Sequence, residues 1–370
     1  MNKSQNPCSI TLTLTEACNL KCYYCYEEQK TTKTMSFKTA KRIIDNELGL
    51  KDDFDIMTID FFGGEPFLEF DLLKTICEYV WSKEWNKEYR FFVSTNGTLI
   101  HGEIKKWLKQ HKEKIWVGLS YDGNYEMQDI NRCNSSDKID LSFFAENWPT
   151  QGVKMTITPK TLPHLANGVI FLHEQGFNVN CNLAYGLDWS NLQYDTILEK
   201  QLSILINYYC SHPEIKPCSM LDMEISYVGI ASQLEYTKWC GAGTSMRVYS
   251  TDGICFPCHF FEPLALGEEK AIKSFDIDFS QAVQLQDKDC NGCCLLPVCP
   301  TCYGSNYATT GDVSQKDKNI CRLTKIMALA NSFLKYKLLT KYTDDDLKIT
   351  TERRKMLTDG IISIQKNFAL

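Results

Sequence analysis

Three cysteines close together near the N-terminus are the residues best suited to chemistry. Cys18, Cys22 and Cys25 form the pattern C-x3-C-x2-C. Three thiolates on so short a loop can bind three corners of a 4Fe-4S cube and leave the fourth iron open to a substrate or cofactor. The alternative is a zinc site completed by a distant residue, but zinc ribbons usually pair C-x2-C units. The spacing therefore favours an iron–sulfur cluster with one open iron.

A second group of cysteines lies in the C-terminal half of the chain. Of the 18 cysteines in 370 residues, eight fall within residues 240–302, and Cys321 follows. Disulfides are not expected, because the N-terminus lacks the charged head and long apolar core of a secretory signal. Clustered cysteines in a reducing compartment usually bind zinc or iron–sulfur clusters. We therefore expect residues 211–330 to form a small domain held together by metal, with structural zinc as the alternative to iron.

The composition excludes several classes of protein. Hydrophobic residues make up 44% of the chain and charged residues 23%, which is typical of a folded domain and not of a disordered one. The net charge is −6, and no long block of like charges suggests a nucleic-acid or membrane surface. No apolar run approaches the roughly 18 residues that a membrane span needs. We expect a cytoplasmic protein without nucleic-acid or membrane partners.

Alternating strand and helix patterns must position the first three cysteines. Period-two or β-branched runs predict strands at residues 9–15, 55–62, 89–94, 114–120, 154–158 and 178–185. Helical periodicity predicts helices at residues 36–48, 72–81, 104–111, 165–174 and 196–209, with Ser36 as an N-cap. This alternation implies an α/β fold with a parallel sheet, either open or curled into a partial barrel.

The loops that follow the first four strands have unusual sequences. They contain the three cysteines, then GGEP at residues 63–66, TNGT at residues 95–98 and YDGN at residues 121–124. In parallel α/β folds the loops after the carboxyl ends of the strands build the active site. We therefore expect all four loops to lie on one rim of the sheet.

The sequence CNLKCYYC, with Tyr24 directly before the third cysteine, and the loops that follow it resemble the radical S-adenosylmethionine (SAM) superfamily. In that family the open iron chelates the amino and carboxylate groups of SAM. One electron then cleaves SAM to methionine and a 5′-deoxyadenosyl radical. The resemblance implies a partial (β/α)6 TIM-like barrel. It also implies cofactor binding by Tyr24, Gly63, Gly64, Glu65, Ser94, Asn96, Ser120, Asp122 and Arg132.

Each of these motifs has a role in the family. By the resemblance, residues 63–66 match the GGEP motif that hydrogen-bonds the methionine amino group. Ser94 and Asn96 match the position that contacts the ribose, and Ser120 and Asp122 match the fourth-strand signature. Gly-rich turns after strands are common, so a single motif would be weak. Four motifs in the expected order are specific.

The later cysteines resemble the SPASM domain, an extension that holds two auxiliary 4Fe-4S clusters in many radical SAM enzymes that modify peptides. Cys240, Gly253 and Cys258 fit its C-x9–15-G-x4-C element. The following C-x2-C-x5-C-x3-C element fits as well, except that two residues instead of three precede Cys302. The resemblance implies one cluster on Cys290, Cys293, Cys299 and Cys321, and another on Cys240, Cys258 and Cys302 with Cys255 as the candidate fourth ligand.

One residue departs from the related sulfatase-maturing enzymes. In those enzymes an Asp directly follows the cysteine that ends the G-x4-C element and acts as general base, whereas His259 stands at that position here. A His can also accept a proton near neutral pH, so His259 is the candidate catalytic residue. A packing role is the alternative. The change weakens the expectation of formylglycine formation.

These observations lead to one functional hypothesis and its alternatives. We expect an enzyme whose 5′-deoxyadenosyl radical takes hydrogen from a peptide or protein, giving a cross-link or an oxidised residue, with flavodoxin or ferredoxin as reductant. The alternatives are sulfatase-type maturation, radical chemistry on a small molecule, and a non-catalytic iron–sulfur or zinc module. The expected domains are a radical SAM core at residues 1–210, a SPASM-like domain at 211–330 and a helical tail at 331–370.

Overall fold

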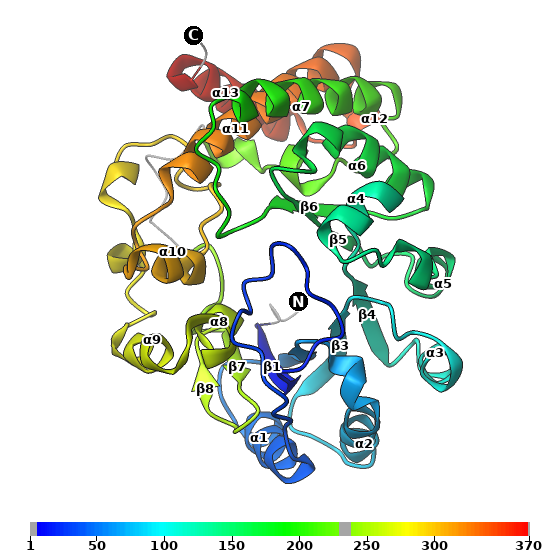
Figure 1. Ribbon diagram of the computed structural model, residues 1–370. Helices are drawn as coiled ribbons and strands as arrows, with labels where there is room; N and C mark the ends of the chain where they lie inside the picture. The colour runs from blue at the N-terminus through cyan, green and yellow to red at the C-terminus, as the bar shows by residue number, and fades with distance from the viewer. Residues whose placement is uncertain (1–5, 229–237, 369–370) are drawn as a thin grey trace. The chain divides into compact units, whose positions relative to one another are not determined.

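The computed structural model describes residues 6–228 and 238–368 (Figure 1). It divides into two compact units, each built from separate stretches of the chain. The first unit comprises Met1–Tyr121, Gln128–Lys154 and Gly241–Ser280, and the second comprises Asp122–Met127, Met155–Cys240 and Gln281–Leu370. The expected domains at residues 1–210, 211–330 and 331–370 rest on composition and stay a prediction.

The first unit contains a six-stranded sheet in the order β4-β3-β2-β1-β7-β8. Its strands are β1 (Pro7–Thr15), β2 (Ile56–Gly63), β3 (Glu88–Thr95), β4 (Ile115–Leu119), β7 (Met246–Tyr249) and β8 (Cys255–Phe256). All neighbouring pairs are parallel except β7 with β8. Thr15 lies beside Gly63, and Thr95 lies beside Leu119. The carboxyl ends of β1 to β4 are therefore aligned at one edge, as the sequence predicts.

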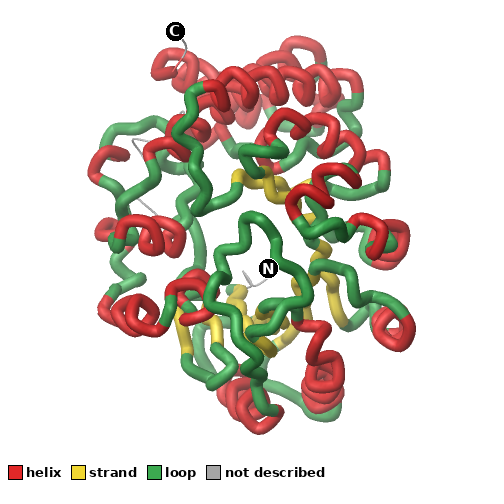
Figure 2. Tube along the Cα trace, in the orientation of Figure 1, coloured by secondary structure: helices red, strands yellow, loops and turns green. Residues whose placement is uncertain are grey.

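Strand β1 is buried on both faces. Ile10, Leu12 and Leu14 are buried on one face, and Thr11 and Thr13 are buried on the other. Burial on both faces is typical of strands in parallel sheets that helices cover. In Figures 1 and 2 the helices of this unit lie outside strands β1 to β4. These helices are α1 (Phe37–Gly49), α2 (Phe70–Trp81), α3 (Gly102–Gln110) and α5 (Leu141–Asn147). The later stretch of the unit adds α8 (Pro263–Leu266) and α9 (Glu268–Lys273).

Helix α1 shows why the predicted helices form where they do. The Ser36 hydroxyl accepts a hydrogen bond from the main-chain N–H of Thr39 at 3.0 Å, which satisfies one of the unpaired donors of the first turn. Ala40, Ile43, Ile44 and Leu48 are buried along one face. The predicted N-cap is confirmed.

Strands five and six also form, but in a separate sheet. β5 (Val153–Ile157) pairs with β6 (Val179–Leu183), and a single parallel bridge joins Ser120 to Lys154 beyond the end of β4. The sequence predicts neither β7 and β8 nor the short helices α4 (Tyr125–Asn131) and α5. Strands β7 and β8 have four and two residues, which are too few to give a periodic signal. The predicted α/β class with a parallel sheet is confirmed.

The second unit is mainly helical. Its helices are α6 (Leu165–Glu174), α7 (Gln193–Ser211), α10 (Tyr303–Thr310), α11 (Lys318–Lys341), α12 (Asp344–Leu347) and α13 (Thr351–Phe368). Helices α11 and α13 run antiparallel. Gln365, late in α13, donates to the Ser332 hydroxyl in the middle of α11, whereas Arg354, early in α13, donates to the Leu339 carbonyl near the end of α11. None of the described helices combines the length and apolar character that crossing a membrane requires.

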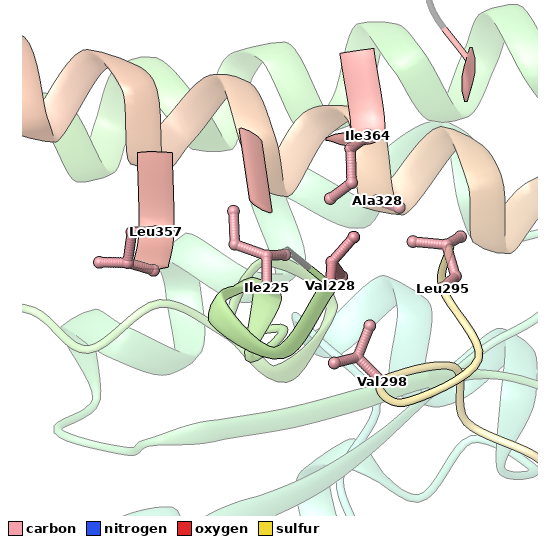
Figure 3. Packing of buried hydrophobic residues seen from close by; sticks show 7 residues of the cluster. All are labelled: Ile225, Val228, Leu295, Val298, Ala328, Leu357 and Ile364. Carbon is pink, nitrogen blue, oxygen red and sulfur yellow. The ribbon is translucent and has the colours of Figure 1, made fainter. Parts of the chain in front are cut away.

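The cysteine-rich segment contributes to a hydrophobic core. Leu295 and Val298 pack with residues of the C-terminal helices in the cluster of Figure 3, which consists of Ile225, Val228, Leu295, Val298, Ala328, Leu357 and Ile364. Cys293 and Cys299 pack against it. The expectation that metal takes the place of a large core in this segment is therefore incomplete, since its apolar residues are buried against helices outside it.

Candidate functional site

A cavity of about 140 Å³ lies in the first unit at the carboxyl ends of the strands. The residues that line it come from five separate stretches of the sequence. They include Cys18, Cys22, Tyr24, Cys25, Tyr26, Glu27, Lys30, Phe62, Gly63, Gly64, Glu65, Ser94, Thr95, Asn96, Ser120 and Arg132. The first three loops and the end of β4 thus meet at one cavity, as expected, but residues 121–124 of the fourth loop do not line it.

The three thiols of the first motif lie around this cavity and are partly exposed. The main-chain N–H of Leu20 donates to the Cys18 sulfur at 3.5 Å, and the Lys30 ammonium donates to the Cys25 sulfur at 2.8 Å. Burial raises the pKa of Cys18 to about 11, so that a bound cation is needed to hold it as a thiolate. Donors directed at sulfur and a thiol that needs a cation fit an iron–sulfur cluster.

The described residues contain no group of three or more His, Cys, Asp or Glu side chains placed to hold a single metal ion. In a 4Fe-4S cube each thiolate binds a different iron, so the three cysteines do not have to meet at one point.

The GGEP loop lies directly against the cysteine loop. The Gly64 N–H donates to the Thr15 carbonyl and the Glu65 N–H donates to the Ala17 carbonyl, both at 2.9 Å. Gly63 has a φ of +131°, which side-chain-bearing residues rarely adopt. A Cβ on Gly63 or Gly64 would lie 2.1 Å from the carbonyl oxygen of Thr15 or Ala17, respectively. Two consecutive glycines are therefore required at this approach.

Glu65 is a buried acid of the cavity, with 1% of its surface exposed. Its carboxylate accepts hydrogen bonds from the Thr95 hydroxyl and the Asn96 N–H, each at 2.8 Å, and from the Phe67 N–H at 3.2 Å. Burial raises the pKa of Glu65 to about 7, while these hydrogen bonds and the charge of Arg132 oppose the rise. An added cation in the cavity would stabilise the ionised form.

The other predicted SAM-binding residues differ in their positions. Ser94, Ser120 and Arg132 line the cavity, and the Arg132 guanidinium lies 5.3 Å from the centre of the Tyr24 ring. Asn96 also lines it, but its side chain is hydrogen-bonded within the protein, to Asn19 and Thr98. Asp122 is fully buried in the second unit and accepts a hydrogen bond from the Thr156 N–H at 2.8 Å. It does not line the cavity.

His259 is buried in the first unit between aromatic rings. Its ring stacks on Phe62 at 4.9 Å between centroids and lies 6.0 Å from Tyr26. Its Nδ1 atom has no hydrogen-bond partner among the described residues. Burial, with a smaller contribution from the charge of Lys154, lowers the pKa of His259 to about 4. The side chain is therefore neutral at pH 7, with a nitrogen available to accept a proton.

The four cysteines assigned by resemblance to one auxiliary cluster lie together in the second unit. Cys290 and Cys299 line a small cavity with Lys316. Burial raises the pKa of Cys290, the charge of Lys316 opposes this, and the charges of Cys299 and Cys321 raise it further. Burial also raises the pKa of Cys299, and the charge of Lys316 lowers it. The charges of Cys321 and Cys293 raise it further. This donor set fits a 4Fe-4S cluster.

The remaining cysteines assigned to the other cluster belong to both units. In the second unit, burial raises the pKa of Tyr185, and the charges of Cys302, Cys299 and Cys240 raise it further, so these thiols lie near the phenol. In the first unit, Cys258 is buried. Burial raises the pKa of Tyr26, and the charges of Glu27, Cys25 and Cys258 raise it further, in that order of size.

Cys255 has different surroundings from Cys258. It is exposed in β8 beside Tyr249, and the charges of Arg247 and Glu47 act on its pKa, which burial raises. The groups that act on its pKa, namely Tyr249, Arg247 and Glu47, belong to β7 and α1. The assignment of Cys255 as the fourth ligand of a cluster stays a prediction.

Several residues of the site have no sequence signal. Glu27 and Lys30 line the cavity, but a charged pair after a cysteine motif usually lies in solvent. Glu262 is buried and accepts hydrogen bonds from the Thr13 hydroxyl at 2.8 and 3.0 Å, from 249 positions away. The pairing of β7 with β1 brings this stretch back to the first strand.

Comparison with known proteins gives a consistent result. The Radical SAM superfamily profile matches residues 12–139. The chain is 35% identical over 170 residues to an uncharacterized protein of Methanocaldococcus jannaschii, covering 44% of this chain and 57% of that protein. It is 36% identical over 134 residues to the antilisterial bacteriocin subtilosin biosynthesis protein AlbA of Bacillus subtilis, covering 35% and 28%. The chain thus spans less than two thirds of both relatives.

Solved structures share the fold. The structure of anSMEcpe with bound AdoMet superimposes with a TM-score of 0.67 at 19% identity and covers 96% of this chain and 98% of that one. SuiB of Streptococcus suis bound to its precursor peptide SuiA gives a TM-score of 0.56 at 16% identity, covering 85% and 76%. The matched profile, the fold and the cysteine-lined cavity agree: the chain contains a radical SAM domain.

Proposed function

We propose that the chain is a radical SAM enzyme that removes a hydrogen atom from an unactivated carbon of a peptide or protein. The observation that carries the proposal is the convergence of three thiols, a buried acid and a buried arginine on one cavity. When bound there, the cluster and SAM supply a 5′-deoxyadenosyl radical. A radical SAM domain implies both cofactors, and the donors around the cavity fit them.

The residues of the cavity have separate roles in this proposal. Cys18, Cys22 and Cys25 hold the cluster. The carboxylate of Glu65 would accept a hydrogen bond from the amino group of SAM, and positive charge on the bound cofactor would favour the ionised form of this acid, whose pKa burial raises. Arg132, with 7% of its surface exposed, supplies a positive charge for the SAM carboxylate. Ser94 and Ser120 are hydroxyls available to the ribose.

A peptide substrate is supported by the relatives. AlbA is named for the biosynthesis of the bacteriocin subtilosin, SuiB has been solved with a precursor peptide, and anSMEcpe has been solved with a Cp18Cys peptide. The substrate radical left after hydrogen abstraction must lose an electron if a cross-link or an oxidised residue is to form. We propose that an auxiliary cluster held by Cys290, Cys293, Cys299 and Cys321 accepts that electron. A second cluster on Cys240, Cys258 and Cys302 is part of the proposal.

A second candidate reaction is the oxidation of a Ser or Cys side chain, as in sulfatase maturation. The specific observation in its favour is the unpartnered Nδ1 of His259, because this reaction needs a base for the proton of the substrate hydroxyl or thiol. The neutral ring can accept that proton, although its low pKa makes it a weak base. Cross-link formation at a carbon–hydrogen bond needs a strong base less than this oxidation does.

The first test is iron content and SAM cleavage after anaerobic reconstitution. The wild type should bind about twelve irons if three clusters form and should release 5′-deoxyadenosine with dithionite, which stands in for a reduced flavodoxin or ferredoxin of the cytoplasm. A triple Ala variant of Cys18, Cys22 and Cys25 should lose about four irons and all SAM cleavage. The matched control is Cys77→Ala, which removes a buried thiol on α2.

Two outcomes would overturn the proposal. Zinc in place of iron, unchanged in the triple variant, would leave a zinc-stabilised binding module. Full iron in the wild type without 5′-deoxyadenosine would leave an electron carrier.

A further inference from the structure

Among the residues that the structure describes, each unit has a lysine whose ammonium group is hydrogen-bonded to a predicted cluster ligand. In the first unit, Lys30 Nζ lies 2.8 Å from the Cys25 sulfur. In the second unit, Lys316 Nζ lies 3.3 Å from the Cys299 sulfur. The two lysines share no sequence motif, and each lines the cavity beside its thiols. The same kind of contact, from a lysine ammonium group to a cysteine sulfur, is therefore present in two different structural settings.

Lys30 is held in place from both sides. Its ammonium group also donates to the Glu27 carbonyl oxygen at 2.8 Å and lies 3.6 Å from the Glu27 carboxylate. The Lys30 side chain is 23% exposed, whereas that of Lys33 is 51% exposed and pairs with Asp252. Proximity in sequence does not place a lysine at the thiol, since Lys33 has the same charge and points away.

Lys316 is positioned through its backbone. Its main-chain N–H donates to the Asp287 carboxylate at 3.0 Å, so the acid binds the backbone and leaves the ammonium group to the thiols. The neighbouring Lys318 pairs instead with Asp287 and Asp289. The charge of Lys316 acts on Cys299 and Cys290, the two thiols that share its cavity.

A positive charge at a ligand sulfur affects the two oxidation states of a cluster unequally. Reduction adds one electron and therefore one negative charge to the cluster and its thiolates. An ammonium group in contact with a thiolate stabilises this more negative state more strongly, and hydrogen bonds to sulfur and local charge are known to set cluster potentials. Partial burial weakens the competing interaction with water.

We propose that Lys30 and Lys316 raise the reduction potentials of the clusters held by Cys25 and Cys299, respectively, and so ease their reduction. They are positioning residues that act through the thiolates and touch neither SAM nor substrate. The inference rests on the proposed function, since it requires that these cysteines bind clusters.

The test is an anaerobic redox titration followed by electron paramagnetic resonance (EPR) of the reconstituted full chain. Lys30→Met should lower the ratio of reduced to oxidised SAM-site cluster about tenfold at a fixed poise, equivalent to a shift of about 59 mV for one electron. Lys30→Arg, which keeps the charge, should stay within about threefold of the wild type. Lys33→Met, the matched control, should leave the ratio unchanged. Lys316→Met should move only the auxiliary signal.

The experiment distinguishes failure of this inference from failure of the proposed function. Full iron with an unchanged midpoint in Lys30→Met overturns the inference and leaves the function intact. Absence of iron in the wild type overturns the function instead. If Lys30→Met cannot retain its cluster, Lys30→Gln keeps a donor without the charge. A wild-type midpoint in that variant, at full iron, overturns the inference, and a lowered midpoint supports it.

Discussion

Gly64 and Ala17 approach each other so closely that a Cβ on Gly64 would lie 2.1 Å from the Ala17 carbonyl oxygen. The clash would be with backbone, which cannot rotate away as a side chain can. The contact joins the loop after β2 to the loop that holds the three cysteines. The position of Glu65, the next residue, depends on it, because the Glu65 N–H donates to the same carbonyl.

Replacing Gly64 with Ala should therefore displace the GGEP loop from the cysteine loop. We expect SAM binding to weaken by at least tenfold and the free energy of unfolding to fall by about 1–3 kcal/mol, as for overpacked sites. Equilibrium dialysis with SAM and urea unfolding would measure the two effects. Gly49→Ala is the matched control, because a Cβ there meets nothing within 4 Å. Equal effects of the two substitutions would refute the proposed contact.

Glu65→Gln should separate the charge of this residue from its shape. Glutamine keeps one acceptor oxygen, but its amide group then faces a donor, either the Asn96 N–H or the Thr95 hydroxyl. We expect a loss of about 1–3 kcal/mol in stability from the unsatisfied donor and a loss of SAM affinity from the missing charge. Urea unfolding of the cluster-free protein with and without SAM would show both. Wild-type SAM affinity in this variant would exclude an ionic role.

The raised pKa of Glu262 predicts that the stability of the protein depends on pH. Burial raises the pKa of Glu262 to about 8, and the Thr13 hydrogen bond opposes the rise. Its folded-state pKa thus lies above the ordinary value, so its stabilising effect is complete at low pH and is lost as the pH rises toward 8. The free energy of unfolding of the cluster-free protein should fall by up to about 1.4 kcal/mol per pH unit through this group.

The Glu262→Gln variant tests that assignment. Its stability should change less steeply between pH 5 and pH 8 (the rough window set by its ordinary and raised pKa values) than that of the wild type, in chemical denaturation at each pH. Parallel curves for the two proteins would mean that another group is responsible.

The sequence anticipated the elements that repeat a simple pattern. Strand β1 alternates Ile10, Leu12 and Leu14 with threonines, and Ser36 caps α1, so both could be predicted from local physics. The loop motifs identified most of the cavity, because parallel strands bring their carboxyl ends to one edge. Asp122 shows the limit of a motif, since its side chain is used to hold the Thr156 backbone.

Residues that depend on long-range packing could not be predicted. Glu262 reaches Thr13 from a stretch that returns to β1 through its pairing with β7, and β7 is too short to give a periodic signal. That contact follows from the tertiary structure and leaves no trace in spacing. Lys30 is only five residues from Cys25, but its contact with the sulfur depends on an irregular loop, in which it also donates to the Glu27 carbonyl, and such a loop has no periodic signal.

His259→Phe should distinguish a catalytic role from a packing role. Phenylalanine can keep the stack on Phe62 and removes the buried nitrogen that has no partner among the described residues. We expect stability equal to or about 1 kcal/mol above that of the wild type, with 5′-deoxyadenosine formation retained within about threefold. Thermal unfolding and product analysis would check this. A large loss of stability would identify His259 as a structural residue.

Cys255 and Cys258 should differ in iron binding. Cys258→Ala should lose about four irons if that thiol holds an auxiliary cluster. Cys255→Ala should lose none, since its thiol lies beside Tyr249 and Arg247. Iron and sulfide analysis of both variants provides the comparison. Loss of about four irons from Cys255→Ala would instead support its assignment as the fourth ligand.

The return of β7 to the side of β1 has a consequence for how the chain folds. One edge of β1 stays unpaired until β7 at Met246–Tyr249 has been made, long after β1 itself. An exposed parallel edge of Ile, Leu and Thr is a template for pairing with other chains. A fragment cut at residue 210 should therefore aggregate, whereas one that extends through β8 can close that edge. Synthesis of the distal segment thus protects the first strand, and high contact order should make this closure slow.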